Sequence, residues 1–275
     1  MVTKRKRVHL VVQRKGGVGK SFISFMLAEY FLSKTKNESN VFLVDTDPTT
    51  HSFVNHQGLK VSYTDLIDSD DKTVNFGRFD EIYNNIVNQN AKNTVIDTGA
   101  SNYLQIVKFL TEGSAELLHE NGFDIIIHVP ITGKDTKQEC LDCFVELAST
   151  FSGTPYVNFV IWLNNLIKSE QKVFKGGNDI IDNLNEYKTF KNKVLAIINT
   201  PLITFETFGK ALSLLMSNHL TFDEIKDLNE IQISETETVL IDQLTKFRLK
   251  KIQSLYNQLI DEAFSSIDAQ SVGNF

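Results

Sequence analysis

The sequence is poor in cysteine and proline, with two and four of these residues among 275. No second Cys or His pair stands beside Cys140 and Cys143 to complete a metal site, so we expect two reduced thiols of a cytoplasmic protein. No apolar run approaches the roughly 20 residues of a membrane-spanning helix. The basic residues 4–7 are followed by few apolar residues and no small-residue cleavage site, so they do not resemble a signal peptide.

A stretch rich in Pro, Gly or Ser that would separate two domains is also missing, and no segment repeats. We therefore expect one domain over residues 1–275, and 41% hydrophobic residues are enough for its core. With 28 Lys and Arg against 34 Asp and Glu, the net charge is −6, which does not indicate a protein dominated by binding to nucleic acid or anionic membranes. The cluster Lys4–Arg7 is interpreted as a solvated lead-in to the first strand, with DNA contact as the alternative.

Short β-rich runs alternate with helical runs along the chain. This alternation predicts an α/β fold of three layers, a doubly wound and mainly parallel sheet with helices on both faces. Strands of such a sheet are buried on both faces and therefore continuously apolar. We predict strands at Val8–Val12, Val41–Val44, Thr94–Ile96, Phe123–Val129, Val157–Leu163 and Val194–Ile198.

A glycine-rich loop, Lys15–Ser21, follows the first predicted strand and precedes an apolar helical run, Phe22–Leu32. In such a loop, successive backbone N–H groups and the helix N-terminus surround an anion, and glycine lets a phosphate come close to the backbone. Lys20 is then placed to reach the β- and γ-phosphates, and the Ser21 hydroxyl to bind Mg²⁺. The loop therefore predicts a nucleoside triphosphate site.

Three carboxylates follow the ends of predicted strands: Asp45 and Asp47 after the second, and Asp97 after the third. Ligands bind at the carboxyl ends of parallel strands, so these carboxylates are expected beside the phosphate loop. A single carboxylate at such a position is also a common helix cap or turn former. Three together favour a metal–triphosphate site.

The loop departs from the ordinary P-loop pattern because Arg14 stands where the first glycine is expected and a second lysine, Lys15, opens the loop. The resulting K-G-G-x-G-K-S resembles the deviant Walker A loop of the ParA/MinD superfamily of dimeric ATPases, whose fold is that of P-loop NTPases. The resemblance implies that Lys15 crosses a dimer interface to the partner's phosphates, and that Gly16, Gly17, Val18, Gly19, Lys20, Ser21 and Phe22 bind the nucleotide.

The same resemblance assigns roles to the carboxylates. Asp97 looks like the Walker B residue that holds Mg²⁺ through a water, and Gly99 like the glycine of switch II. The segment Asp45-Thr46-Asp47-Pro48 resembles switch I, so Asp47 orients the attacking water and Asp45 supports the metal shell. Expected catalytic residues are thus Lys15, Lys20 and Asp47, with Ser21, Asp45 and Asp97 at the metal.

The base is expected to be adenine. Asn164, after the fifth strand, matches the position that contacts adenine in ParA/MinD proteins, and Pro201 matches the position that packs the base. Each of these two residues could instead belong to a plain turn that ends a strand. Related GTPases read guanine with an Asp three residues after the Asn, and Ile167 stands there. We therefore predict ATP.

Several further segments are similar to the TraL-type branch of this superfamily, ParA-like ATPases of conjugative-transfer regions related to StbB-type plasmid-stability proteins: Val11–Gln13, Asp97–Ser101, Val129–Gly133, Val160–Asn164, Thr204–Lys210 and Leu220–Asp223. The resemblance implies an ATP-dependent homodimer in the bacterial cytoplasm that hydrolyses ATP slowly. It would act with a protein partner, and with non-specific DNA as an open alternative, in plasmid transfer, stability or positioning.

The last predicted helix, about residues 239–264, carries apolar residues and a basic cluster, Lys246–Lys251. MinD relatives bind membranes through a terminal basic amphipathic helix. We favour a helix packed on the sheet with its lysines in solvent, because Asp261 and Glu262 follow and the basic residues are sparse.

Two other functions remain open at this stage. An ATP-dependent small-molecule kinase or ligase on the same fold would need a substrate pocket beside the γ-phosphate, and no group of residues indicates one. An ATPase with a dimer-bridging iron–sulfur cluster would need cysteines at the dimer face. Cys140 and Cys143 lie on a predicted helix, Thr136–Phe151, without the turn residues that favour such ligation.

Overall fold

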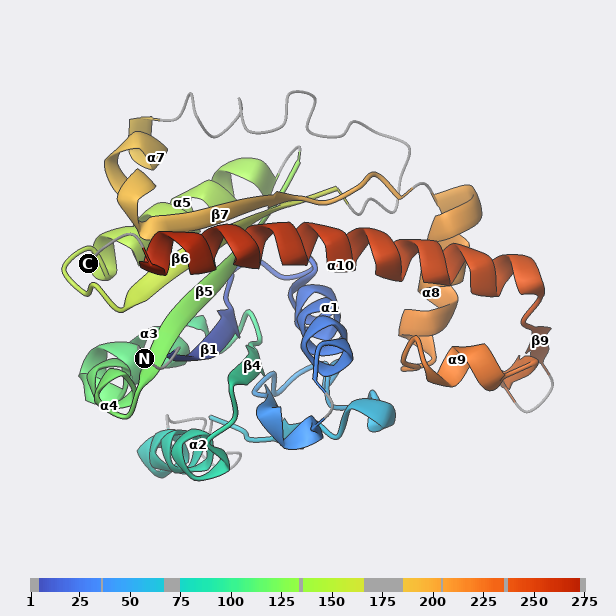
Figure 1. The fold of residues 1–275 in the computed structure, drawn as a ribbon, viewed down its shortest axis with the longest axis horizontal. Helices are drawn as coiled ribbons and strands as arrows, with labels where there is room; N and C mark the ends of the chain where they lie inside the picture. The colour runs from blue at the N-terminus through green and yellow to red at the C-terminus, as the bar shows by residue number, and fades with distance from the viewer. Residues whose placement is uncertain are drawn as a thin grey trace.

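The computed structural model describes residues 5–35, 37–66, 75–133, 136–165, 185–203, 205–234 and 237–272. Within these ranges seven parallel strands form one sheet in the order β3-β2-β4-β1-β5-β6-β7 (Figure 1). The predicted parallel α/β sheet is confirmed. Its strands are β1 (Lys6–Val11), β2 (Val41–Asp45), β3 (Ser62–Tyr63), β4 (Asn93–Asp97), β5 (Phe123–Thr132), β6 (Val157–Asn164) and β7 (Val194–Asn199).

Helices cover both faces of this sheet. Figure 1 shows α1 and α10 in front of the strands and α5 behind them. Behind lie α2 (Phe76–Gln89), α3 (Tyr103–Phe109), α4 (Ala115–Glu120), α5 (Lys137–Thr150) and α7 (Asn185–Phe190). In front lie α1 (Lys20–Ser33), α8 (Lys210–Ser217), α9 (Glu224–Asp227) and α10 (Gln243–Val272), and a small antiparallel pair, β8 (Glu230–Gln232) and β9 (Thr238–Leu240), precedes α10. Short 3₁₀ and π turns lie at Glu38–Asn40, Gln57–Leu59, Leu110–Ser114, Lys191–Lys193 and Phe205–Gly209.

Successive residues of a strand pack alternately into two hydrophobic cores, one on each face of the sheet. In β6, Phe159 and Ile161 belong to the core behind the sheet, and Val160 and Trp162 to the core in front. This follows from the two-residue period of a strand, and it explains why the strands lack polar alternation. α1 is buried along its whole length from Phe22 to Phe31, because the sheet covers one side and α10 another.

The register of the central strands places their carboxyl ends together. Val11 of β1 and Asp45 of β2 both pair with Asp97 of β4. The loop after β1 and the segments after β2 and β4 therefore meet at one edge of the sheet.

The structure differs from the predictions at the C-terminal helix. α10 begins at Gln243 rather than Val239, because Val239 pairs with Ile231 in the β8–β9 ribbon and the Asp242 carboxylate accepts the Thr245 N–H at 2.6 Å. As favoured, the helix packs on α1 and β7. None of the helices in the described ranges combines the length and the apolar character that a membrane crossing requires.

The N-terminal basic cluster leads into β1 as interpreted, but its described side chains have partners in the folded chain, and that of Arg7 is largely buried. Arg5 pairs with Asp124 of β5 at 2.7 Å, and Arg7 pairs with Asp268 of α10 at 2.5 Å. Lys4 lies outside the described residues. These ion pairs connect β1 to a neighbouring strand and to the last helix, contacts that a local sequence pattern cannot reveal.

A chain of hydrogen bonds between buried rings crosses the front core. The Trp162 indole donates to His128 Nδ1 at 2.9 Å, His128 Nε2 and His9 Nδ1 are 3.0 Å apart, and His9 Nε2 lies 3.4 Å from the Asn93 side-chain oxygen. Because Trp162 can only donate, His128 Nδ1 is the acceptor, and His128 Nε2–H is left to donate to His9. Both imidazoles are therefore neutral. Burial lowers the pKa of His128 to about 3 and that of His9 well below its usual value.

We expect these histidines to make the protein acid-sensitive. Their pKa values are lower in the folded than in the unfolded chain, so the stabilisation is complete above pH 6.5 and is lost as the pH falls below it. The variant His128→Gln keeps an acceptor and a donor but cannot titrate. In urea unfolding between pH 6 and 4.5, the free energy of unfolding of the wild type should fall by about 1.4 kcal/mol more per pH unit than that of this variant.

The comparison with His128→Gln cancels the buried carboxyls Glu29 and Asp97, which both proteins share and whose raised pKa values act in the opposite sense. Parallel pH curves for wild type and His128→Gln would contradict the assignment.

Candidate functional site

The loop between β1 and α1 has the backbone shape of an anion cradle. Gly17 and Gly19 have φ values of 73° and 93°, in the left-handed region that favours glycine, and Gly19 is the residue immediately before α1. The Lys20 ammonium folds back over the loop and donates to the Lys15 carbonyl at 3.3 Å. Burial lowers the pKa of Lys20, while the charges of Asp97 and Asp47 act against this shift.

Asn164, at the end of β6, lies directly over this loop. Its amide donates to the Val18 carbonyl at 2.8 Å, and a Cβ at Gly19 would collide with the same amide nitrogen. Gly19 therefore has two requirements that only glycine meets, a positive φ and space for Asn164.

Asp97, at the end of β4, is fully buried beside the start of α1. Its Oδ1 accepts the Ser24 hydroxyl at 2.8 Å, while its Oδ2 is buried without a hydrogen-bond partner in the described structure. Burial and the charge of Asp45 raise the pKa of Asp97 to about 7, against the hydroxyls of Ser21 and Ser24 and the charge of Lys20. A cation beside Oδ2 would satisfy both the open oxygen and the buried charge, so this carboxylate and the Ser21 hydroxyl fit Mg²⁺.

The segment after β2 is held by its own carboxylates. Asp45 is buried, and its two oxygens accept the N–H groups of Asp47 at 2.8 Å and Val54 at 2.9 Å. Asp47 accepts the Thr49 N–H and the Thr50 hydroxyl, at 2.9 and 2.8 Å. Asp45 therefore shapes the segment that presents Asp47.

Gly99 lies against Asp47. A Cβ built on Gly99 would stand 2.6 Å from Asp47 Oδ1, closer than real Cβ atoms approach, and 3.2 Å from Pro48 Cδ, which is a tight contact. The segments after β2 and β4 are thus in contact through these residues.

Asn102 is a residue of the site that sequence reasoning missed. It is fully buried, and its amide donates to the Thr46 carbonyl, while the Thr46 hydroxyl donates to the Asp97 carbonyl at 2.8 Å. Thr98 also donates to the Val11 carbonyl at 2.7 Å. An Asn just after the Asp97–Ser101 segment gives no local pattern that would single it out.

An open cleft of about 1010 Å³ extends from the loop to α8, a volume at the upper end of small-molecule sites. It is lined by Gly17, Gly19, Ser21, Phe22, Ser52, Asn164, Ile203, Gly209, Leu212, Ser213, Met216, Ser217 and His219. Pro201 is half-buried after β7 and is not among the lining residues, whereas Ile203 is. The α8 wall was not predicted.

Lys15 is directed to α5. Its ammonium forms an ion pair with Glu139 at 2.8 Å, and the neighbouring Arg14 pairs with Glu146 of the same helix at 2.9 Å. The structure thus brings Lys20, Asp47, Asp97, Gly99 and Asn164 together, whereas the Lys15 side chain contacts α5 instead.

The two cysteines of α5 are free and buried in the core behind the sheet. Burial raises the pKa of Cys143 to about 11 and also raises that of Cys140. Both thiols therefore stay protonated at neutral pH, whereas cluster ligation needs thiolates at an accessible face. This chemistry gives no support to an iron–sulfur site.

The chain is similar to known nucleotide-binding proteins. Residues 9–202 match the model of the CobQ/CobB/MinD/ParA nucleotide binding domain. The chain is 31% identical over 222 residues to a protein of Escherichia coli named Protein TraL, covering 79% of this chain and 86% of that protein. A second Escherichia coli Protein TraL is 30% identical over 258 residues, covering 92% and 97%.

Solved structures with a similar chain course include a plasmid partition protein of Borrelia burgdorferi B31 bound to AMPPNP. It is 18% identical, with a TM-score of 0.46, and the match covers 95% of this chain and 98% of that one.

Proposed function

This chain belongs to the CobQ/CobB/MinD/ParA nucleotide-binding family, and we propose that it is an ATP-dependent dimerisation switch that hydrolyses ATP slowly. The observation that carries the proposal is the meeting of the glycine loop, Asp47 and Asp97 at one edge of the sheet, where the buried Asp97 Oδ2 has no hydrogen-bond partner among the described residues. A phosphate loop and a carboxylate that can hold a cation are the two parts that nucleotide hydrolysis requires at minimum.

In this proposal the loop backbone from Gly16 to Phe22 binds the phosphates, with the α1 N-terminus behind it. Lys20 leaves the Lys15 carbonyl and contacts the β- and γ-phosphates. Ser21 and Asp97 hold Mg²⁺, which when bound neutralises phosphate charge.

Asp47 orients the attacking water in this proposal, and Gly99 presents its N–H near the γ-phosphate. Because Gly99 lies against Asp47, a movement of one segment is transmitted to the other. The γ-phosphate can thus order the two segments together, as in other nucleotide switches.

We propose adenine as the base, placed between Asn164 and the apolar part of the cleft wall. Phe22, Ile203, Leu212 and Met216 offer the apolar contacts that a purine needs, and Pro201 would act from the edge of this pocket.

The partner subunit's phosphates are the proposed target of Lys15, so that two ATP molecules are enclosed in a homodimer. A protein partner would then set the rate of hydrolysis, with non-specific DNA as a second ligand. We place this activity in the bacterial cytoplasm, in plasmid transfer or maintenance, because the TraL-type segments of the sequence accompany 30–31% identity to two proteins named TraL.

Light scattering tests the proposal directly. With Mg²⁺, the protein should keep one mass in ADP and double its mass in AMPPNP. Lys15→Gln should bind AMPPNP but stay at the lower mass, because it lacks the charge that reaches the partner. A single mass in both nucleotides would contradict the switch and favour a small-molecule kinase or ligase.

A further inference from the structure

The residues that lead into the glycine loop lie along α5. Gln13 is fully buried, and its amide donates to the carbonyls of Pro130 at 3.1 Å and Cys140 at 3.2 Å. Arg14 and Lys15 then each meet a glutamate of α5. The start of the loop is thus fixed to this helix at three successive residues.

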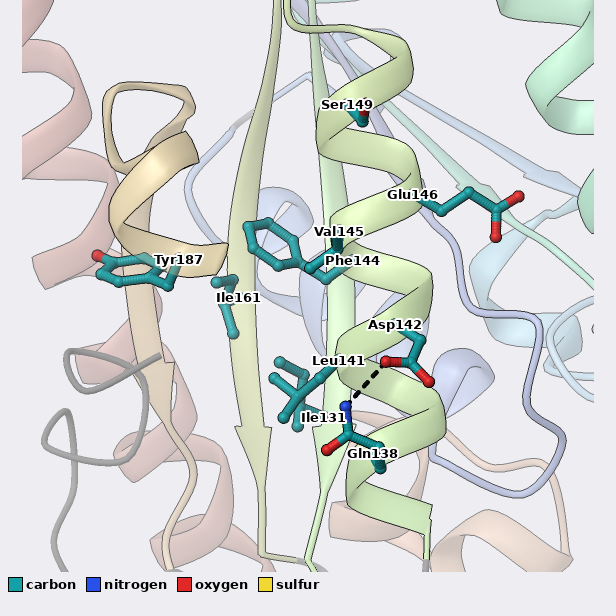
Figure 2. Close-up of a pocket in the computed structure, with 10 residues that line it drawn as sticks. All are labelled: Ile131, Gln138, Leu141, Asp142, Phe144, Val145, Glu146, Ser149, Ile161 and Tyr187. Carbon is teal, nitrogen blue, oxygen red and sulfur yellow. Dashed lines mark hydrogen bonds between the residues drawn. The ribbon is translucent and has the colours of Figure 1, made fainter. Parts of the chain in front are cut away.

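The two glutamates lie on one side of α5. Glu139 and Glu146 are seven residues apart, close to two turns, so they share a face of the helix. Figure 2 shows the Glu146 carboxylate pointing away from the side chains of Phe144 and Tyr187, although all three residues line the same pocket. The acidic face of α5 is the one that meets Arg14 and Lys15.

The two lysines of the loop are engaged differently. Lys20 is 8% exposed and lies over the loop backbone, whereas the Lys15 side chain is 37% exposed and bound to Glu139. The hydrogen bond and charge of Glu139 raise the pKa of Lys15, so its ammonium remains charged. Lys15 therefore carries the charge that a phosphate would attract, but that charge already has a partner within the same chain.

We propose that Glu139 is a positioning residue that holds Lys15 on its own subunit and thereby sets how readily the nucleotide-bound dimer forms. The inference rests on the proposed function, in which Lys15 contacts the phosphates held by a second copy of this chain. To reach those phosphates the Lys15 side chain turns away from Glu139 of its own α5, so each subunit gives up its Lys15–Glu139 pair on dimerisation.

The expected effect is moderate for one pair and larger for the dimer. Exposed ion pairs contribute little, about twofold to fivefold in an equilibrium constant. Two such pairs are lost per dimer, so their effects multiply. Removing the Glu139 charge should therefore tighten the dimer about tenfold.

The test compares two variants of the same helix. Dimer dissociation constants are measured by sedimentation equilibrium with AMPPNP and Mg²⁺ for the wild type, Glu139→Gln and Glu146→Gln. Glu139→Gln should dimerise about tenfold more tightly, and Glu146→Gln, which frees Arg14 instead, should match the wild type. Thermal unfolding of both variants checks that the fold is retained.

The salt dependence of dimerisation distinguishes a charge effect of Glu139 from a purely structural effect, which salt would not change. The advantage of Glu139→Gln should shrink between about 50 and 500 mM NaCl, because salt screens the exposed pair in the wild type. The double variant Glu139→Gln/Lys15→Gln should dimerise no more tightly than Lys15→Gln alone at any salt concentration.

A Glu139→Gln dimer as weak as the wild type, or weaker, overturns the inference while the switch stands. A wild type that stays monomeric with AMPPNP contradicts the proposed function itself. The two failures are therefore separate results of one experiment.

Discussion

Replacing Asp47 by Asn is expected to reduce ATP hydrolysis at least about 100-fold, because a carboxylate that positions and polarises the attacking water contributes about 10²- to 10⁴-fold. ATP affinity should stay within about threefold of the wild type, since the loop binds the phosphates and Asp97 is assigned to the Mg²⁺. The variant should also accumulate as a dimer with ATP, because the step that dissolves the dimer is slowed. Steady-state phosphate release and light scattering measure the two effects.

The geometry makes Asn a suitable replacement. Its side-chain oxygen can still accept the Thr49 N–H that Asp47 accepts at 2.9 Å, so the turn is retained. Asp142→Asn, on the exposed surface of α5, removes the same charge outside the site and should behave as the wild type. Normal hydrolysis in Asp47→Asn would exclude the proposed role.

Gly99→Ala is expected to reduce hydrolysis about 100-fold and to prevent the ATP-dependent increase in mass while nucleotide still binds. The added methyl group would stand 2.6 Å from Asp47 Oδ1, so Asp47 or the chain at Gly99 must move. Displacements of this size at catalytic groups cost about 100-fold in rate. Phosphate release and the affinity for a fluorescent ATP analogue, measured together, distinguish a displaced switch from a lost site.

Gly153→Ala is the matched control for this substitution. A Cβ at Gly153 meets nothing within 4 Å, and its φ is outside the left-handed region, so the same methyl group should be neutral there. If Gly99→Ala hydrolyses ATP like Gly153→Ala, the contact between the two segments has no role in catalysis.

Much of this site was predictable because strand ends in a parallel sheet are local features with a common destination. The apolar runs ending at Asp45 and Asp97 required no knowledge of distant contacts, and both became neighbouring strands. The strands were predicted to within a few residues because most of their residues are apolar and the central strands are largely buried. The two-residue strand β3, Ser62–Tyr63, was not predicted, since two exposed residues carry no periodicity.

Other contacts of the site and core join residues that are far apart in the sequence, and a local sequence pattern does not predict which of them meet. Glu139 stands among exposed polar residues of an amphipathic helix and became the partner of Lys15 only through the packing of α5 beside the loop. His9 reads as one polar residue in an apolar strand until β5 supplies His128 beside it. Asn102 likewise gained its role from Thr46 on another strand's loop. Long-range side-chain pairing thus limited the prediction of the site.

The place of β1 between β4 and β5 has a consequence for how the protein is made on the ribosome. The glycine loop is synthesised early, yet β1 has no neighbouring strand until residues 93–132 have emerged, and Arg7 meets Asp268 only after α10 exists. Contacts so distant in sequence form slowly, because a long loop must close first. A nascent chain should therefore be unable to bind nucleotide through most of its translation. The ability to bind should appear late, when the sheet and α10 fold together.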